Sequence, residues 1–167
     1  MDNILIKHED IVGACKKIGT AITKQYEGKE LTVICVLKGA EPFHAELIKH
    51  IDLDMQTDFV QVKSYEGTES TGVITLKKDI DTDISGKDIV IVEDIVDSGY
   101  TLTWLKETLS QRGPNSITVV TMLDKPSRRK IPFEPDYVCF TIDDLFVYGF
   151  GLDLDEKCRN LKDIYVK

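Results

Sequence analysis

The sequence predicts an α/β protein built on a mostly parallel sheet. Continuous apolar runs of strand length stand at 31–37, 89–92 and 117–123, and helix-compatible segments separate them. Strands that are apolar on both faces are typical of the centre of a parallel sheet, and their alternation with helices favours that topology. With 167 residues and no repeat, linker or low-complexity tract, the chain is expected to form one domain over residues 1–167.

Each element is predicted from the spacing of its apolar residues. Helices are expected at 8–26, after Pro42, and at 101–111, where Gly113-Pro114 ends the helix. Strands are expected at 31–37, 58–62, 73–77, 89–92, 117–123 and 137–141. The tail from Asp143 onward has a mixed pattern, and we expect it to cover the C-terminal edge of the sheet as a small subdomain.

Charge and composition exclude some classes of function. The net charge of −8 argues against a nucleic-acid partner, because phosphate backbones are bound by clustered basic residues. The one basic cluster, formed by Lys125, Arg128, Arg129 and Lys130, is short, and apart from Lys125 it is expected to be solvated or at a subunit contact. No apolar run could span a bilayer and the start MDNILIKHED lacks a signal-peptide core, so a cytoplasmic protein without a membrane partner is expected.

The cysteines predict neither disulfides nor zinc. Cys15, Cys35, Cys139 and Cys158 are widely spaced, form no CxxC pair and stand mostly in apolar surroundings. Buried, reduced thiols are the expected state.

The segment IVIVEDIVDSGYTL, residues 89–102, combines a buried strand with three carboxylates and a small polar loop. Ligands of parallel sheets collect at the carboxyl ends of the strands, where the backbone N–H groups of such a loop can hold a phosphate. Adjacent acids there can bind a diol or Mg²⁺, so a ribose 5-phosphate fits the pattern. A solvated acidic strand end followed by Asp97 as a helix cap is the alternative, and the spacing alone leaves both open.

The segment VEDIVDSGYTL closely resembles the phosphoribosyl pyrophosphate (PRPP) motif of the purine phosphoribosyltransferases. The longer segment DISGKDIVIVEDIVDSG resembles the hypoxanthine-guanine branch in particular. The resemblance implies a type I phosphoribosyltransferase fold, with a small hood formed by the C-terminal and N-terminal parts of the chain and a flexible lid loop. It also implies that Glu93 and Asp94 grip the ribose hydroxyls and Mg²⁺. The loop of Asp97, Ser98, Gly99, Tyr100 and Thr101 would hold the 5-phosphate, and Asp97 would act as general acid/base toward N7 of the purine.

Two further segments resemble loops of this family. VLKGA (36–40) resembles the pyrophosphate loop, which implies binding by Lys38 and Gly39 and a cis peptide bond between Leu37 and Lys38. SYEGTESTG (64–72) resembles the loop that closes over the reacting centre, with Ser64-Tyr65 at its start. A closing loop suits this chemistry, because an oxocarbenium-like intermediate must be kept from water.

The purine side of the site is implied by two C-terminal segments. Lys125 in MLDKPSRRK resembles the lysine that donates to the exocyclic oxygen of a 6-oxopurine and so discriminates against adenine. The segment 143–161, DDLFVYGFGLDLDEKCRNL, resembles the base-binding region of the family. There Phe146 would stack on the purine, Val147 would read its edge, Leu152 and Asp153 would complete the pocket, and Arg159 would contact pyrophosphate. Asp153 would also reach a second Mg²⁺ through water.

The expected reaction is the Mg²⁺-dependent transfer of a phosphoribosyl group from PRPP to hypoxanthine or guanine, giving IMP or GMP and pyrophosphate. The family also suggests a homodimer or homotetramer. One rival is a PRPP-sensing regulator of nucleic acids, against which the negative charge and the full set of purine-site residues argue. A second rival is a phosphotransfer receiver domain with Asp94 or Asp97 as acceptor, which leaves the C-terminal aromatic segment unexplained.

Overall fold

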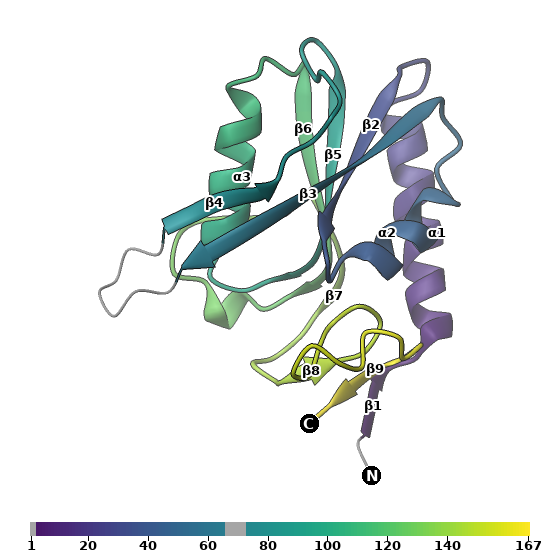
Figure 1. Ribbon diagram of the computed structural model, residues 1–167. Helices are drawn as coiled ribbons and strands as arrows, with labels where there is room; N and C mark the ends of the chain where they lie inside the picture. The colour runs from purple at the N-terminus through teal and green to yellow at the C-terminus, as the bar shows by residue number, and fades with distance from the viewer. Residues whose placement is uncertain (1–2, 66–72) are drawn as a thin grey trace.

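The computed structural model describes residues 3–65 and 73–167. Its main element is a six-stranded sheet of order β4-β3-β2-β5-β6-β7, in which β4 alone is antiparallel to its neighbour (Figure 1). The strands are β2 (Leu31–Leu37), β3 (Met55–Tyr65), β4 (Val73–Lys78), β5 (Asp88–Val96), β6 (Ser116–Asp124) and β7 (Tyr137–Thr141). This topology confirms the predicted mostly parallel α/β sheet.

Helices cover both faces of the sheet. Helices α1 (His8–Gln25) and α2 (Glu41–Ile48) pack on one face, and α3 (Tyr100–Ser110) packs on the other. Strand β5 shows why: Val90 and Val92 join the core under α1 and α2, whereas Ile89 and Ile91 join the core under α3. Successive side chains of a strand point to opposite faces, so a continuous apolar run serves two helical layers.

A small antiparallel sheet, called the hood here, lies at one end of the large sheet (Figure 1). Its strands are ordered β1-β9-β8, where β1 is Asn3–Ile6, β8 is Val147–Tyr148 and β9 is Ile164–Val166. The two ends of the chain therefore meet in one sheet. The predicted C-terminal subdomain is present, and the N-terminal contribution to the hood that the resemblance implied is confirmed. Strand β1 itself was not predicted, because it has only four residues and no repeating pattern.

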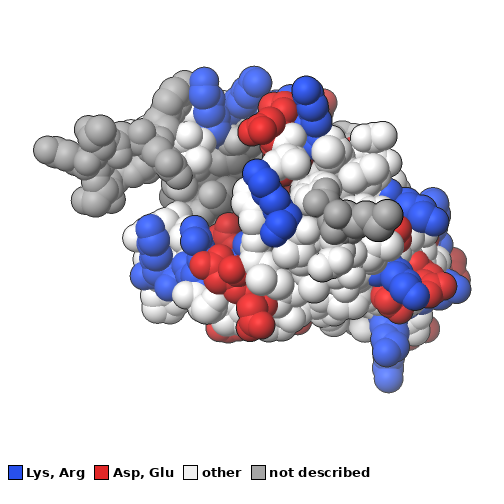
Figure 2. Space-filling model, turned by 90° about the horizontal axis from the view of Figure 1, so that it is seen from below, with Lys and Arg blue, Asp and Glu red and all other residues white. Residues whose placement is uncertain are grey.

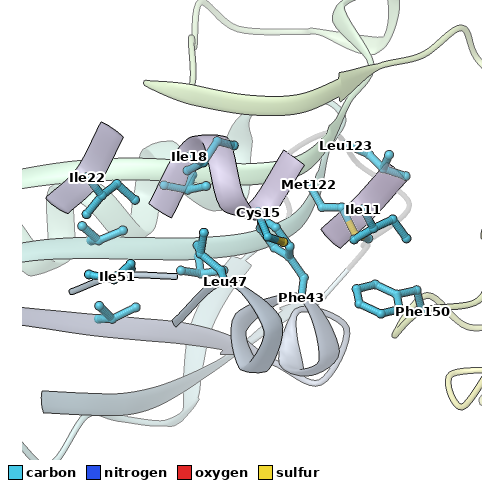
Figure 3. Close-up of a cluster of buried hydrophobic side chains, with 14 of the residues drawn as sticks. Ile11, Cys15, Ile18, Ile22, Phe43, Leu47, Ile51, Met122, Leu123 and Phe150 are labelled. Carbon is cyan, nitrogen blue, oxygen red and sulfur yellow. The ribbon is translucent and has the colours of Figure 1, made fainter. Parts of the chain in front are cut away.

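The hood shares a hydrophobic core with the main sheet. Ile11, Cys15, Ile18 and Ile22 line one side of α1 and face Phe43 and Leu47 of α2, with Phe150 of the hood region at one end of the row (Figure 3). The pairs Ile11/Cys15 and Ile18/Ile22 are four residues apart, which is the spacing that places side chains on one helical face. A shared core supports the single-domain prediction.

Strand β5 is longer than its apolar run. It continues through Glu93 and Asp94 to Val96, so the acids lie inside the strand and not beyond its end as predicted. Pairing with β6, whose Thr121 lies opposite Glu93, supports the strand where the apolar pattern stops.

All four cysteines are free thiols. Cys15 and Cys35 are buried, and burial raises the pKa of each to about 12. Cys139 and Cys158 are only half-buried, which is more exposure than expected for core thiols. Within residues 3–65 and 73–167, no helix has the length and hydropathy needed to cross a bilayer.

Candidate active site

The candidate site lies where three neighbouring parallel strands end. Strands β2, β5 and β6 pair in parallel, so their carboxyl ends meet at one edge of the sheet. There β2 continues into the Lys38-Gly39 turn, β5 into the loop 97–101, and β6 into Lys125. The backbone N–H of Lys125 donates to the Val96 carbonyl at 3.0 Å, which ties two of these endings together. Binding sites of parallel sheets are formed at this edge.

The acid pair is packed closely against the turn after β2. Glu93 is buried and Asp94 is half-buried, and a Cβ atom at Gly39 would overlap the Asp94 Oδ2 atom. Glycine is therefore required at position 39 by the approach of a carboxylate rather than by its backbone angles. The Leu37–Lys38 peptide bond is cis, as the resemblance implied.

Burial raises the pKa of both acids. The pKa of Glu93 is raised well above its usual value, first by burial and then by the negative charge of Asp94. Burial also raises the pKa of Asp94, while the Ile95 N–H and the positive charge of Arg159 act in the opposite direction. Burial and the neighbouring negative charge both disfavour the ionised form of Glu93, and a cation beside the pair would favour the ionised form of both carboxylates.

The acid pair predicts a pH dependence of stability for the cation-free protein. Because the folded-state pKa of Glu93 is raised, the native state binds more protons than the unfolded state above the ordinary glutamate pKa of 4.5. The stabilisation that Glu93 gives the folded state is fully present below pH 4.5. Above that pH the free energy of unfolding falls as the pH rises toward the raised pKa, by up to about 1.4 kcal/mol per pH unit. Urea unfolding in EDTA between about pH 5 and 8 measures this slope.

The Glu93→Gln variant isolates the effect. Burial lowers the pKa of His44, which gives a slope of the opposite sign as the pH rises toward the unfolded value of histidine, about 6.5. This contribution is common to both proteins and cancels in the difference between wild type and Glu93→Gln. Identical slopes for the two proteins would show that Glu93 is ionised in the folded state.

The loop 97–101 has the form expected of an anion cradle. Gly99 has φ 89°, in the left-handed region that favours glycine, and it caps α3 without any side-chain hydrogen bond. Asp97 is therefore not the helix cap, which removes the structural alternative for this residue. The Asp97 Oδ1 atom is buried and has no hydrogen-bond partner within the described structure. Buried acceptors are normally satisfied, so this oxygen is available to accept a hydrogen bond from a bound partner.

Arg129 fixes the back of this loop. Its guanidinium donates to the Asp97 carbonyl at 3.0 Å and the Phe133 carbonyl at 2.8 Å, and it forms an ion pair with Asp124 at 2.7 Å. The prediction of a solvated or subunit-contact role is wrong for Arg129, because its side chain is only 12% exposed. The sequence carries a weak signal for this pairing in the Asp124 that precedes the basic run.

The predicted purine residues surround the end of β6. Lys125 is buried, with Nζ 3.9 Å from a carboxylate oxygen of Asp144. Phe146 is 55% exposed, which is unusual for phenylalanine, and the Lys167 ammonium lies 5.7 Å from its ring centroid. Val147 and Leu152 are buried. The Phe146 side chain is thus accessible to a planar ligand, with the Lys167 ammonium near its ring, while the residues beside it are buried.

The loop between β8 and β9 reaches back to the Lys38-Gly39 turn. A Cβ atom at Gly151 (φ 96°) would overlap the Gly39 carbonyl, so the two turns are in contact. Arg159 donates to the Gly151 carbonyl at 2.8 Å and lies 3.2 Å from Asp153 and 3.1 Å from Glu156. Glu156 also pairs with Lys38 at 3.2 Å. Sequence reasoning missed both Gly151 and Glu156.

The predicted lid segment, residues 64–72, is described only at its start. Ser64 is exposed near the end of β3, and Tyr65 ends that strand, but its side chain is not among those described. The predicted lid at 66–72 lies outside the described residues. On the face seen in Figure 2, basic and acidic side chains are interspersed and form no broad area of one charge among the residues coloured there.

The donor set fits a cation that the ligand helps to hold. Within the part of the chain that the structure describes, no three side chains of His, Cys, Asp or Glu converge as a metal site. Glu93 and Asp94 supply two carboxylates, and Mg²⁺ is commonly held by one or two carboxylates together with substrate oxygens and water. The raised pKa values of both groups agree with a site that requires a cation.

Comparisons with known proteins agree with this geometry. The model of the phosphoribosyl transferase domain matches residues 2–156. A hypoxanthine-guanine phosphoribosyltransferase of Lactococcus lactis is 50% identical over 162 residues, which cover 96% of this chain and 88% of the relative. A solved hypoxanthine phosphoribosyltransferase of Staphylococcus aureus superposes with a TM-score of 0.95 at 45% identity, covering 98% of this chain and 90% of that one. The hypoxanthine phosphoribosyl transferase of Trypanosoma cruzi, solved in work on its C-terminal region, oligomeric state and activity, has a TM-score of 0.93 at 36% identity and covers 98% and 90%.

The chain therefore belongs to the phosphoribosyltransferase family. Within that family it groups with the hypoxanthine-guanine phosphoribosyltransferases, which are pentosyltransferases of purine salvage. The predicted family, type I fold and enzyme class are confirmed. The roles of individual residues stay predictions.

Proposed function

We propose that this chain transfers the 5-phosphoribosyl group of PRPP to N9 of hypoxanthine or guanine, releasing IMP or GMP and pyrophosphate. The observation that carries the proposal is the convergence, at one sheet edge, of the Lys38-Gly39 turn, the Glu93-Asp94 pair and the loop 97–101. These three parts match the three parts of PRPP: a diphosphate, a ribose diol and a terminal phosphate.

In the PRPP half of the site, backbone N–H groups bind the phosphate and carboxylates bind the ribose. The N–H groups of the loop 97–101 and the start of α3, with the hydroxyls of Ser98 and Thr101, hold the 5-phosphate. Tyr100 is 47% exposed, so it contributes its backbone alone. Glu93 and Asp94 accept hydrogen bonds from the ribose hydroxyls. Glu93 and Asp94 would also hold Mg²⁺, and Asp153 would reach a second ion through water. When bound, these ions would supply positive charge beside the pyrophosphate.

The purine half of the site selects and orients the base. Phe146 offers an open ring face for stacking, and Val147 and Leu152 form fixed apolar walls. Asp97 faces N7 and takes or returns the purine proton, through the carboxylate oxygen that has no hydrogen-bond partner among the described residues.

Catalysis rests on positioning and on stabilising the leaving group. The C1–O bond breaks well before N9 attacks, because the ribose ring oxygen stabilises the cation. The cationic groups of Lys38 and Arg159 attract the pyrophosphate as its charge develops. The loop beginning at Ser64-Tyr65 would exclude water from the cation.

A product assay tests the proposal. The protein is incubated with PRPP and Mg²⁺, and hypoxanthine, guanine, xanthine and adenine are supplied in separate reactions. We expect IMP and GMP, no AMP, and loss of both products when EDTA is added. Absence of nucleotide from every base, with PRPP binding still detected by calorimetry, would favour the sensor function instead.

Replacing Lys125 by Ala tests the selection of the base. Loss of the ammonium leaves the exocyclic oxygen of the base without its donor, so kcat/KM for hypoxanthine should fall about 10- to 100-fold. Selectivity over adenine should fall by a similar factor, because that donor no longer penalises an amino group. Arg128→Ala is the matched control, since Arg128 pairs with the same Asp144 but is 53% exposed. Unchanged selectivity in Lys125→Ala would remove this role.

The cellular compartment and the oligomeric state of the protein are also proposed. We propose a cytoplasmic enzyme that acts as a homodimer or homotetramer, and no partner chain is required by the residues assigned above. Light scattering at several protein concentrations determines the mass of the assembly.

A further inference from the structure

We propose that Glu156 is an internal competitor of pyrophosphate, holding Lys38 and Arg159 in the absence of substrate. This inference rests on the pyrophosphate-binding roles proposed for those two cations. The Glu156 carboxylate spans both of them: Oε2 lies 3.2 Å from Lys38 Nζ, and Oε1 lies 3.1 Å from Arg159 Nη2. A single carboxylate thus occupies the two positive charges that a diphosphate would need.

The two cations depend on Glu156 to different degrees. Arg159 keeps Asp153 and the Gly151 carbonyl as further partners, so its position does not depend on Glu156. For Lys38, Glu156 is the one acidic partner found among the described residues. Removing the carboxylate should therefore free Lys38 and leave Arg159 in place.

The ion pair between Lys38 and Glu156 is weak enough for a diphosphate to displace it. The side chains of Lys38 and Glu156 are 57% and 68% exposed, and solvated ion pairs contribute little free energy. Asp155 and Glu156 have φ of 53° and 60°, in a region that residues other than glycine seldom adopt. The Glu156 N–H donates to Asp153 at 3.0 Å, which holds this backbone in place. A diphosphate with higher charge would replace the carboxylate, and the carboxylate would return when the product leaves.

Calorimetric titration with pyrophosphate in Mg²⁺ tests this proposal on the whole chain. Glu156→Gln keeps the size of the side chain and removes its charge, so Kd should fall about three- to tenfold. Glu27→Gln is the matched control: it makes the same charge change on an exposed residue before β2, at the opposite end of the sheet, and Kd should be unchanged. Higher salt should reduce the difference between the two variants.

The possible results separate this inference from the proposed function. Wild type and Glu156→Gln that bind pyrophosphate equally would overturn the competitor role alone. Weaker binding by Glu156→Gln would also overturn it, because Glu156 would then be a residue that positions the cations. If wild type and both variants bind no pyrophosphate, the roles of Lys38 and Arg159 fail together with this inference.

A second and independent observation concerns a groove between α1 and the edge strand β7. We infer that this groove is a contact between two copies of the chain, related by a twofold axis at Gly13. The groove has a volume of about 530 Å³ and is lined by α1, by β1 and by the apolar residues of β7. β7 is the last strand of the large sheet, so its outer edge has no neighbouring strand within the described structure.

Gly13 has no role within a single chain that explains it. It lies inside α1, where glycine is the least favourable residue apart from proline. Beyond its chain neighbours and the backbone of α1, no atom of the described residues lies within 4 Å of the position its Cβ would take. A glycine with open space around it on a groove wall is the residue that lets a second backbone approach closely.

The charges on α1 are arranged symmetrically about Gly13. Glu9 and Lys17 lie four residues before and after it, on the same face and in the lining of the groove. In an antiparallel crossing at Gly13, Glu9 of one copy faces Lys17 of the other, and the twofold axis makes this contact twice. This self-complementarity specifies a second copy as the occupant.

A charge swap tests the twofold contact. Glu9→Lys and Lys17→Glu should each place like charges opposite each other and halve the mass of the assembly at low micromolar concentration, measured by sedimentation. The double variant should restore the wild-type mass. Lys24→Glu is the control, because it lies on α1 outside the groove lining and should leave the mass unchanged. A monomeric wild type, unchanged single variants, or a double variant no better than the singles would each overturn the contact.

Discussion

Replacing Asp97 by Asn should lower kcat by about 10²- to 10⁴-fold, the range for loss of a general acid/base, with little change in the affinity for PRPP. The side chains have the same shape, but the amide cannot take the purine proton. The Asp97 Oδ1 atom is buried without a partner, so the change breaks no hydrogen bond at that atom in the described structure. Stopped assays of IMP formation give kcat, and calorimetry gives the Kd for PRPP.

The control for this result is Asp143→Asn. Asp143 is exposed, and the same loss of charge there should leave kcat unchanged. If Asp97→Asn retained wild-type kcat, Asp97 would have no part in the proton transfer. A large loss of PRPP affinity with unchanged kcat would instead assign Asp97 to ligand binding.

Local sequence patterns predicted most of the main sheet. The limits of β2 and β7 agree with the predicted strands, because each apolar run ends where the strand ends. The end of β5 was missed, since Glu93 and Asp94 break the pattern of apolar residues while strand pairing continues. Strand β1 was missed for another reason: its partner β9 lies at the other end of the chain, and no local period reveals a pairing of that kind.

The candidate site was predicted by motif resemblance more than by spacing. Asp97 could equally have been a helix cap until the structure showed that Gly99 caps α3 without a side-chain bond. Contacts such as Arg129 with the Asp97 carbonyl and Glu156 with Lys38 join loops that are distant in sequence. Such contacts depend on how the loops fold back over the sheet edge, and residue types alone do not determine this.

Substitution of Gly39 by Ala should lower kcat/KM by about 10²-fold or more, because the added methyl group must displace the Asp94 carboxylate from its position. The backbone of Gly39 has no positive φ, so alanine is not strained there and the free energy of unfolding should change little.

Gly151→Ala makes the matching comparison from the facing turn. Its φ of 96° and its overlap with the Gly39 carbonyl oppose any side chain, so it should lose activity and also about 1–3 kcal/mol of stability. Assays of kcat/KM paired with urea unfolding separate the two causes. A Gly39→Ala enzyme with full activity would show that the position of Asp94 is not critical, and equal stability losses in both variants would show that the two turns act as one structural unit.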